Sequence, residues 1–177
     1  MMKKSILLHI CCGVCGSGVI ERLRDEGFNV MGFFYNPNIY PEEEYKRRLE
    51  VTRQVSKILD FKLIEGEYEK DKWFKLTENL KNEPEGGKRC SVCFRMRLEK
   101  TCKKSLELNI PYFTTTLSIS PHKNVLIINK IGSDLGKENF MERDFKKRDG
   151  TKLAMEFSKK YNLYRQNYCG CVYSMYG

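Results

Sequence analysis

The chain has 177 residues, of which 41% are apolar and 31% are charged, so it is long enough for one domain with a real core and too apolar for a disordered chain. Its formal net charge of +9 favours an anionic partner, usually nucleic acid. Two clusters, YKRR (45–48) and DFKKRDGTK (144–152), make the positive charge local and favour a phosphate-binding face.

The N-terminal stretch MMKKSILLHICC predicts a short buried strand over 5–10 rather than a signal peptide. Its apolar run is about five residues and includes His9, whereas a signal peptide needs roughly 7–15 apolar residues. No apolar segment approaches the ~20 residues of a membrane span. We therefore expect a cytoplasmic protein with no membrane attachment.

Strands and helices alternate along the rest of the chain. After a glycine turn, the pattern predicts further strands over 29–37, 61–66 and 112–117. It predicts helices over 16–27, 41–60, 71–80, 88–109, 120–132 and 150–162, of which the fifth is opened by Ser120 and Pro121. Residues 81–87 are expected to form a loop and residues 163–175 an irregular tail.

This alternation predicts a single α/β domain, residues 1–177, built on a parallel sheet flanked by helices. In such sheets ligands bind beyond the carboxyl ends of the strands. The first strand ends directly before CCGVCGSG (11–18), and the fourth ends at TTLSIS (115–120). We expect these two segments to line the same crevice.

Eight cysteines in a cytoplasmic chain of this size do not indicate a disulfide scaffold. They form four groups: Cys11, Cys12 and Cys15; Cys90 and Cys93; Cys169 and Cys171; and Cys102 alone. Thiolates are soft ligands that select zinc, copper(I) or iron–sulfur clusters. Five cysteines in two tight groups therefore favour metal or cluster binding over ordinary buried thiols.

The spacing of the first two groups favours an iron–sulfur cluster over zinc. Structural zinc prefers closely joined pairs, but Cys15 and Cys90 lie 75 residues apart. A cluster is wider than a single ion and suits such scattered donors. Gly13, Gly16 and Gly18 let the backbone approach a bulky group, and the helix start favours an anionic one.

Cys90 and Cys93 share one face at the start of the predicted helix 88–109. The helix dipole there is expected to lower the pKa of both thiols. Cys102 follows Cys93 by nine residues, about half a turn around the helix axis, so we expect a buried structural thiol outside the site.

The segment YCGC places Cys169 and Cys171 one glycine apart. A disulfide between them would be strained, and strained disulfides tend to be catalytic or regulatory, so a redox pair is favoured over extra metal ligands. His9 and His122 are candidate ligands or acid–base groups, although lone histidines are more often structural. The tyrosines of the tail and Arg165 either stack on a nucleotide or pack the tail against the core.

Five segments together resemble the epoxyqueuosine reductases of the QueH type. These are LLHICCGVCG, FYNPNIYPEEEYKRR, GGKRCSVCFRMRLEKT, FTTTLSISPHKN and YRQNYCGC, which run from residue 7 to residue 171. The resemblance implies an adenine-nucleotide α-hydrolase-like fold (a PP-loop or HUP-like fold). In that group the first loop grips pyrophosphate, whereas here it carries Cys11, Cys12 and Cys15.

The resemblance also implies the last step of queuosine formation. The epoxide of epoxyqueuosine at the tRNA wobble position is reduced to an alkene, with two electrons from an external donor and loss of water. It further implies a [4Fe-4S] cluster held by Cys11, Cys12, Cys90 and Cys93, a redox pair of Cys169 and Cys171, and no cobalamin. Cys15 either replaces one of these ligands or helps to hold an additional iron.

The proton donor for the departing oxygen stays open among Tyr168, His9 and Asp60. Two other functions also stay open. An ATP-dependent tRNA-sulfurating enzyme would need a phosphate loop resembling SGGxDS, from which CCGVCGSG departs at nearly every polar position. A zinc-stabilised RNA-binding module would be colourless and would leave its RNA unchanged, but scattered ligands and the CGC pair count against it.

Overall fold

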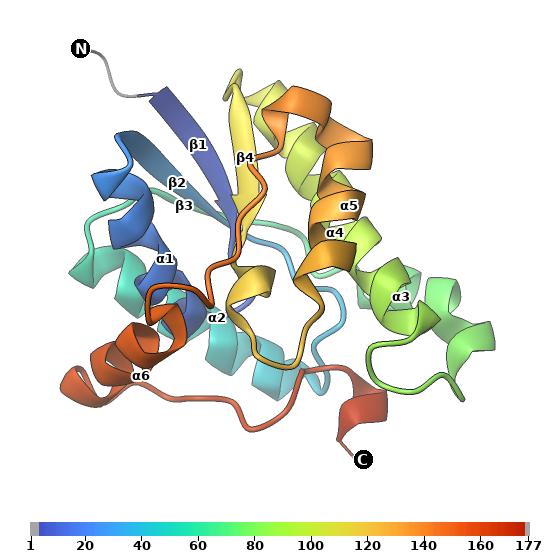
Figure 1. Ribbon diagram of the computed structural model, residues 1–177. Helices are drawn as coiled ribbons and strands as arrows, with labels where there is room; N and C mark the ends of the chain where they lie inside the picture. The colour runs from blue at the N-terminus through green and yellow to red at the C-terminus, as the bar shows by residue number, and fades with distance from the viewer. Residues whose placement is uncertain (1–3, 176–177) are drawn as a thin grey trace.

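A computed structural model describes residues 4–175 of the chain, and four parallel strands form its central sheet (Figure 1). They are β1 (Lys4–His9), β2 (Phe28–Phe34), β3 (Leu63–Glu65) and β4 (Tyr112–Thr115), in the order β3-β2-β1-β4. The central strand β1 pairs with both β2 and β4. Its residues Ile6, Leu7 and Leu8 are fully buried because both faces of the strand are covered.

Six α-helices cover the sheet: α1 (Gly13–Asp25), α2 (Glu42–Ile58), α3 (Lys70–Thr77), α4 (Lys88–Glu107), α5 (Val125–Gly136) and α6 (Gly150–Lys160). Short 3₁₀ turns lie at Glu78–Leu80, Thr116–Ile119, Lys137–Asn139 and Val172–Ser174.

Alternate residues of β1 point into two separate cores. Ile6 and Leu8 pack with side chains of α1, α2 and α6. Leu7 packs on the other face with side chains of α3, α4 and α5. Helices, sheet and helices thus form three layers (Figure 1). The predicted α/β class with a parallel sheet flanked by helices is therefore confirmed.

Two helix starts differ from the sequence predictions in ways that matter for the site. The first helix begins at Gly13 rather than residue 16, because the sulfur of Cys12 caps it by accepting from the Cys15 amide at 3.3 Å. The helix predicted over 120–132 begins at Val125, because the side chain of Asn124 caps it. Residues 120–123 therefore form a loop at the sheet edge.

Residues 1–3 of the N-terminal stretch and residues 176–177, which the predicted domain also includes, lie outside the described part of the chain. Within residues 4–175 no helix has the length and apolar character needed to cross a bilayer.

Candidate active site

The cysteine loop, residues 11–15, leads from β1 into α1 at the carboxyl edge of the sheet. The sulfur atoms of Cys11, Cys12 and Cys15 all lie within 4.8 Å of one another. The hydroxyl of Thr116, just after β4, accepts from the Cys11 amide at 3.0 Å and donates to the Cys11 sulfur at 3.1 Å. Three thiols this close form a soft donor set that can hold a metal ion.

Close packing of two helices fixes the cysteine loop. A Cβ atom on Gly13 would lie 2.8 Å from the carbonyl oxygen of Val51 and 2.9 Å from the Cα of Thr52, both in α2. Only glycine therefore lets the start of α1 approach α2 this closely. The sulfurs consequently sit on a rigid helix pair rather than on a free loop.

The cysteine loop favours one negative charge, at Cys11. Hydrogen bonds with the thiols of Cys12 and Cys15 lower the pKa of Cys11 well below its usual value, despite burial, and Arg97 and Lys123 add to this effect. The same hydrogen bond with Cys11 raises the pKa of Cys12 to about 12 and also raises that of Cys15. A bound metal would replace the remaining thiol protons.

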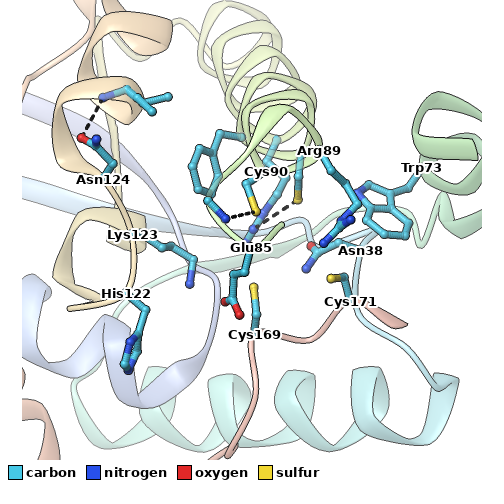
Figure 2. Close-up of a pocket in the computed structure, with 15 residues that line it drawn as sticks. Asn38, Trp73, Glu85, Arg89, Cys90, His122, Lys123, Asn124, Cys169 and Cys171 are labelled. Atoms are coloured by element: carbon cyan, nitrogen blue, oxygen red, sulfur yellow. Dashed lines mark hydrogen bonds between the residues drawn. The ribbon is translucent and has the colours of Figure 1, made fainter. Parts of the chain in front are cut away.

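Two further cysteine pairs line a small cavity of about 30 Å³ (Figure 2). Cys90 and Cys93 come from the first turns of α4, and Cys169 and Cys171 come from the C-terminal strap, residues 163–175. Burial raises the pKa of Cys90 and raises that of Cys93 to about 11. The prediction that the helix dipole lowers both values is therefore wrong, because desolvation of the thiolates outweighs the dipole.

The same cavity gathers buried polar atoms that lack hydrogen-bond partners. Among residues 4–175 five such side-chain atoms occur, and four of them belong to residues that line this cavity: Asn38 Oδ1, Trp73 Nε1, Arg89 Nε and Arg97 Nε. A buried polar atom left unpaired costs about 1–3 kcal/mol. The cavity is therefore built to receive a polar or charged group beside the sulfurs, and it has room for little more than one water molecule.

A larger cleft of about 510 Å³ adjoins the small cavity and is lined by all three cysteines of the cysteine loop. Five residues line both spaces: Glu85, Arg97, His122, Lys123 and Cys169. Cys169 thus adjoins both the cysteine loop, which lines the cleft, and the pair Cys90 and Cys93, which lines the small cavity. A cleft of this volume accommodates a nucleoside, whereas the small cavity does not.

Arg48 of α2 fixes the C-terminal strap. Its buried guanidinium donates to the carbonyl of Cys169 at 3.0 Å and of Tyr168 at 3.2 Å, and it pairs with Glu44 at 2.7 Å. Gly170 has φ of +120°, and a Cβ there would lie 2.9 Å from Arg48 Nη1. Glycine between the two cysteines is therefore required by both backbone conformation and space.

The predicted redox pair stands free in this structure, since all eight cysteines are free thiols. Cys171 is buried, whereas Cys169 is half-buried and lines both spaces. Cys102 lies outside both spaces as predicted. It is half-buried rather than buried as predicted, and its sulfur lies 3.8 Å from the carbonyl oxygen of Leu135 in α5.

His9 is a structural residue rather than a ligand. It is fully buried, its Nε2 donates to the Tyr35 carbonyl at 3.0 Å, and its Nδ1 therefore accepts from the Thr115 hydroxyl at 2.8 Å. Burial lowers the pKa of His9 to about 3, which keeps the ring neutral. His122 is exposed in the loop at the mouth of both spaces.

The other two candidate proton donors are disfavoured by position. Tyr168 lines the cleft, but its hydroxyl already donates to the Tyr40 carbonyl. Asp60 follows the C-terminus of α2 and lies at the opposite edge of the sheet, where its carbonyl accepts from Arg24. Asp60 as proton donor is therefore wrong, because the carboxyl ends of the strands and the cysteines lie at the other edge.

Sequence reasoning missed four residues that line or support the site: Arg48, Trp73, Glu85 and Arg97. Only Arg97 had a local signal, since it follows Cys93 by one helical turn and its Nη1 lies 3.8 Å from that sulfur. The others reach the site through the packing of distant segments.

Comparison with known proteins identifies close relatives. A family model described as "Epoxyqueuosine reductase QueH" matches residues 6–176. The epoxyqueuosine reductase QueH of Streptococcus pyogenes serotype M1 is 40% identical over 182 residues, covering 98% of this chain and 71% of the relative. The proteins of the same name from Staphylococcus epidermidis and Thermotoga maritima are 40% and 35% identical; the alignments cover 97% of this chain in both cases and 76% and 90% of those relatives.

Proposed function

This chain belongs to the epoxyqueuosine reductase QueH family, and we propose that it reduces the epoxide of epoxyqueuosine in the tRNA anticodon to give queuosine. The observation that best supports this function is the meeting of two cysteine groups at one edge of the sheet, with Cys169 between them. The substrate nucleoside would leave the stack of the anticodon loop and enter the 510 Å³ cleft.

We assign Cys11, Cys12, Cys90 and Cys93 as the ligands of a [4Fe-4S] cluster, which would pass electrons one at a time from the external donor. The donor set fits such a group: the thiols are soft, and Arg97 and Lys123 offset the negative charge that a thiolate-bound cluster carries. Cys15 has two roles that agree with its place beside Cys12, either as an alternative ligand or as a ligand of an additional iron. Cobalamin takes no part in this proposal.

Cys169 and Cys171 form the proposed redox pair, and their chemistry balances the reaction. Opening the epoxide to an alkene takes up two electrons and two protons and releases the oxygen as water. Oxidation of two thiols to one disulfide gives up two electrons and two protons. An external electron donor must then restore both thiols before the next turnover.

We propose different tasks for the two members of the pair. Cys169 faces the cleft and is the member that can reach the substrate, while buried Cys171 is placed to complete the disulfide. Arg48 holds the backbone of Cys169, and the Tyr40 amide donates to the Gly170 carbonyl at 2.8 Å. Both contacts hold the backbone of the pair beside the small cavity, with Cys169 also lining the cleft.

Anaerobic purification with iron and sulfide analysis tests this function, followed by an EPR spectrum after dithionite reduction. We expect a brown protein with a reduced-cluster signal that converts epoxyqueuosine-containing tRNA to queuosine-containing tRNA under reducing conditions. A colourless protein that holds only zinc despite ample iron would contradict electron transfer and favour a zinc-stabilised RNA-binding module.

Two cysteines of the same helix provide a matched pair of variants. C93S should lose most of the bound iron and the conversion of tRNA, because it removes a proposed cluster ligand. C102S should keep both, because Cys102 lies outside both spaces although it is also on α4. Equal iron content in the two variants would contradict the assignment of Cys93.

A further inference from the structure

Among residues 4–175, Glu85 is the one acidic residue that lines the small cavity or the cleft, and it lines both. It lies in the loop between the 3₁₀ turn at Glu78–Leu80 and α4. Figure 2 shows its carboxyl group directed toward Cys169 and the side of the cavity that carries Lys123. The carboxylate therefore stands where the two cysteine groups meet.

The loop around Glu85 is held firmly. The guanidinium of Arg89 donates to the carbonyls of Leu80 at 2.9 Å and of Glu83 at 2.6 Å. The Gly86 amide donates to the sulfur of Cys90 at 3.2 Å. Because residues on both sides are anchored, the backbone of Glu85 is held near the cysteines of α4, and its exposed side chain lines both spaces.

The Glu85 carboxylate is available to a ligand. Among residues 4–175 no hydrogen bond or ion pair engages it, although Arg97 and Lys123 line the same spaces. Other acids of this region are engaged: Glu83 accepts from the Lys88 amide at 3.0 Å, and Glu69 pairs with Lys100 at 2.9 Å. A free carboxylate at this point repels phosphate and attracts a cationic group.

The proposed substrate carries such a group. In epoxyqueuosine a secondary amine, protonated at neutral pH, joins the 7-deazaguanine base to the cyclopentane ring. The ring carbon that bears this nitrogen is bonded directly to an epoxide carbon. A carboxylate that binds the ammonium therefore also places the epoxide, and an unmodified guanosine offers no such cation.

We propose that Glu85 binds the secondary ammonium of the modified nucleoside and thereby selects epoxyqueuosine-containing tRNA over tRNA with guanosine at the wobble position. This inference rests on the proposed function. It assigns Glu85 a recognition role, with the ammonium at the carboxylate and the epoxide beside Cys169.

Anaerobic binding measurements with two tRNAs test this role, one with epoxyqueuosine and one with guanosine at the wobble position. Wild-type protein should bind the modified tRNA about tenfold or more tightly, the size of a charge-assisted hydrogen bond. E85Q should lose this preference and bind the unmodified tRNA as wild type does. The matched control E78Q, in an exposed position outside both spaces, should keep the preference.

Turnover separates recognition from proton transfer. In E85Q the loss should fall on KM rather than on kcat, and E85D should recover part of it. A preference that persists in E85Q, or a large drop in kcat with unchanged binding, would overturn the proposal. If wild-type protein discriminates between the tRNAs but converts neither, the proposed reduction fails while the recognition role stands.

Discussion

Trp73 is the largest fully buried side chain of the described residues, and its indole N–H still lacks a hydrogen-bond partner. It lies in the wall of the cavity that Cys93 also lines. Burial raises the pKa of Cys93, whereas Arg97 and Trp73 lower it. N–H donors near a cluster sulfur stabilise the more negative, reduced state and so raise the reduction potential. Such donors would raise the potential of the proposed cluster.

We therefore expect W73F to lower the midpoint potential of the proposed cluster by on the order of 50 mV, where about 59 mV is tenfold for one electron. The control F74L changes a neighbouring ring whose centroid lies 5.3 Å from that of Trp73 but which does not line the cavity. A redox titration followed by EPR measures both potentials. Equal shifts in the two variants would assign the effect to packing rather than to the N–H group.

At the scale of elements, the contact between α1 and α2 carries the cysteine loop. Gly13 permits this contact. A Cβ atom on Gly16, one turn later in α1, would lie 3.4 Å or more from its nearest neighbours, which all belong to the side chain of Ile10. The two glycines stand in the same helix and differ only in what lies opposite them, so they form a natural comparison.

We expect G13A to destabilise the protein by about 1–3 kcal/mol, because its methyl group would press on the backbone of Val51 and Thr52. G16A should be neutral or stabilising by up to about 1 kcal/mol, since alanine favours helix. Urea unfolding of the two variants measures both effects. Equal stability of G13A and wild type would show that α1 can shift away from α2 at no cost.

Much of this arrangement could be predicted from sequence. The alternation of strands and helices predicts the parallel sheet, and the rule for strand ends places the cysteine loop and TTLSIS at one crevice. Helix periodicity places Cys90 and Cys93 together and Cys102 apart. These inferences succeed because each depends on local spacing or on one general rule of sheet topology.

The remainder depends on how distant segments pack. The unpaired polar atoms around Cys93 come from α3, α4 and the loop after β2, and no spacing in the sequence relates them. The strap reaches the site through the buried contact of Arg48 with residue 169, and YKRR suggested only a basic surface. The pKa values of Cys90 and Cys93 follow burial, which the helix-dipole argument did not include.

At the scale of the whole molecule, positive charge is distributed unevenly around the cleft. Arg148 and Lys152 are exposed beside the start of α6, and that helix contributes Thr151, Ala154 and Met155 to the cleft lining. Lys57 and Lys62 are also exposed, but they lie at the end of α2 and before β3, at the opposite edge of the sheet. The basic cluster 144–152 thus borders the proposed substrate site.

We expect R148Q/K152Q to weaken tRNA binding and to reduce the slope of log K against log salt by about 1 to 2, as two phosphate contacts predict. K57Q/K62Q, with the same loss of charge at the other edge, should change the slope little. Binding measured between low and moderate salt gives both slopes. Equal slopes for the two double variants would mean that tRNA binding depends on the net charge of the protein and not on this face.

The distribution of the sulfurs along the chain has a consequence for biosynthesis. The cysteine loop, residues 11–15, is synthesised long before the strap that carries Cys169 and Cys171. During translation the four strands of the sheet can pair while the strap is still inside the ribosomal exit tunnel. The strap can reach the site only after it has emerged from the tunnel, so a nascent chain holds the proposed cluster ligands, which lie within residues 11–93, before it holds the proposed redox pair.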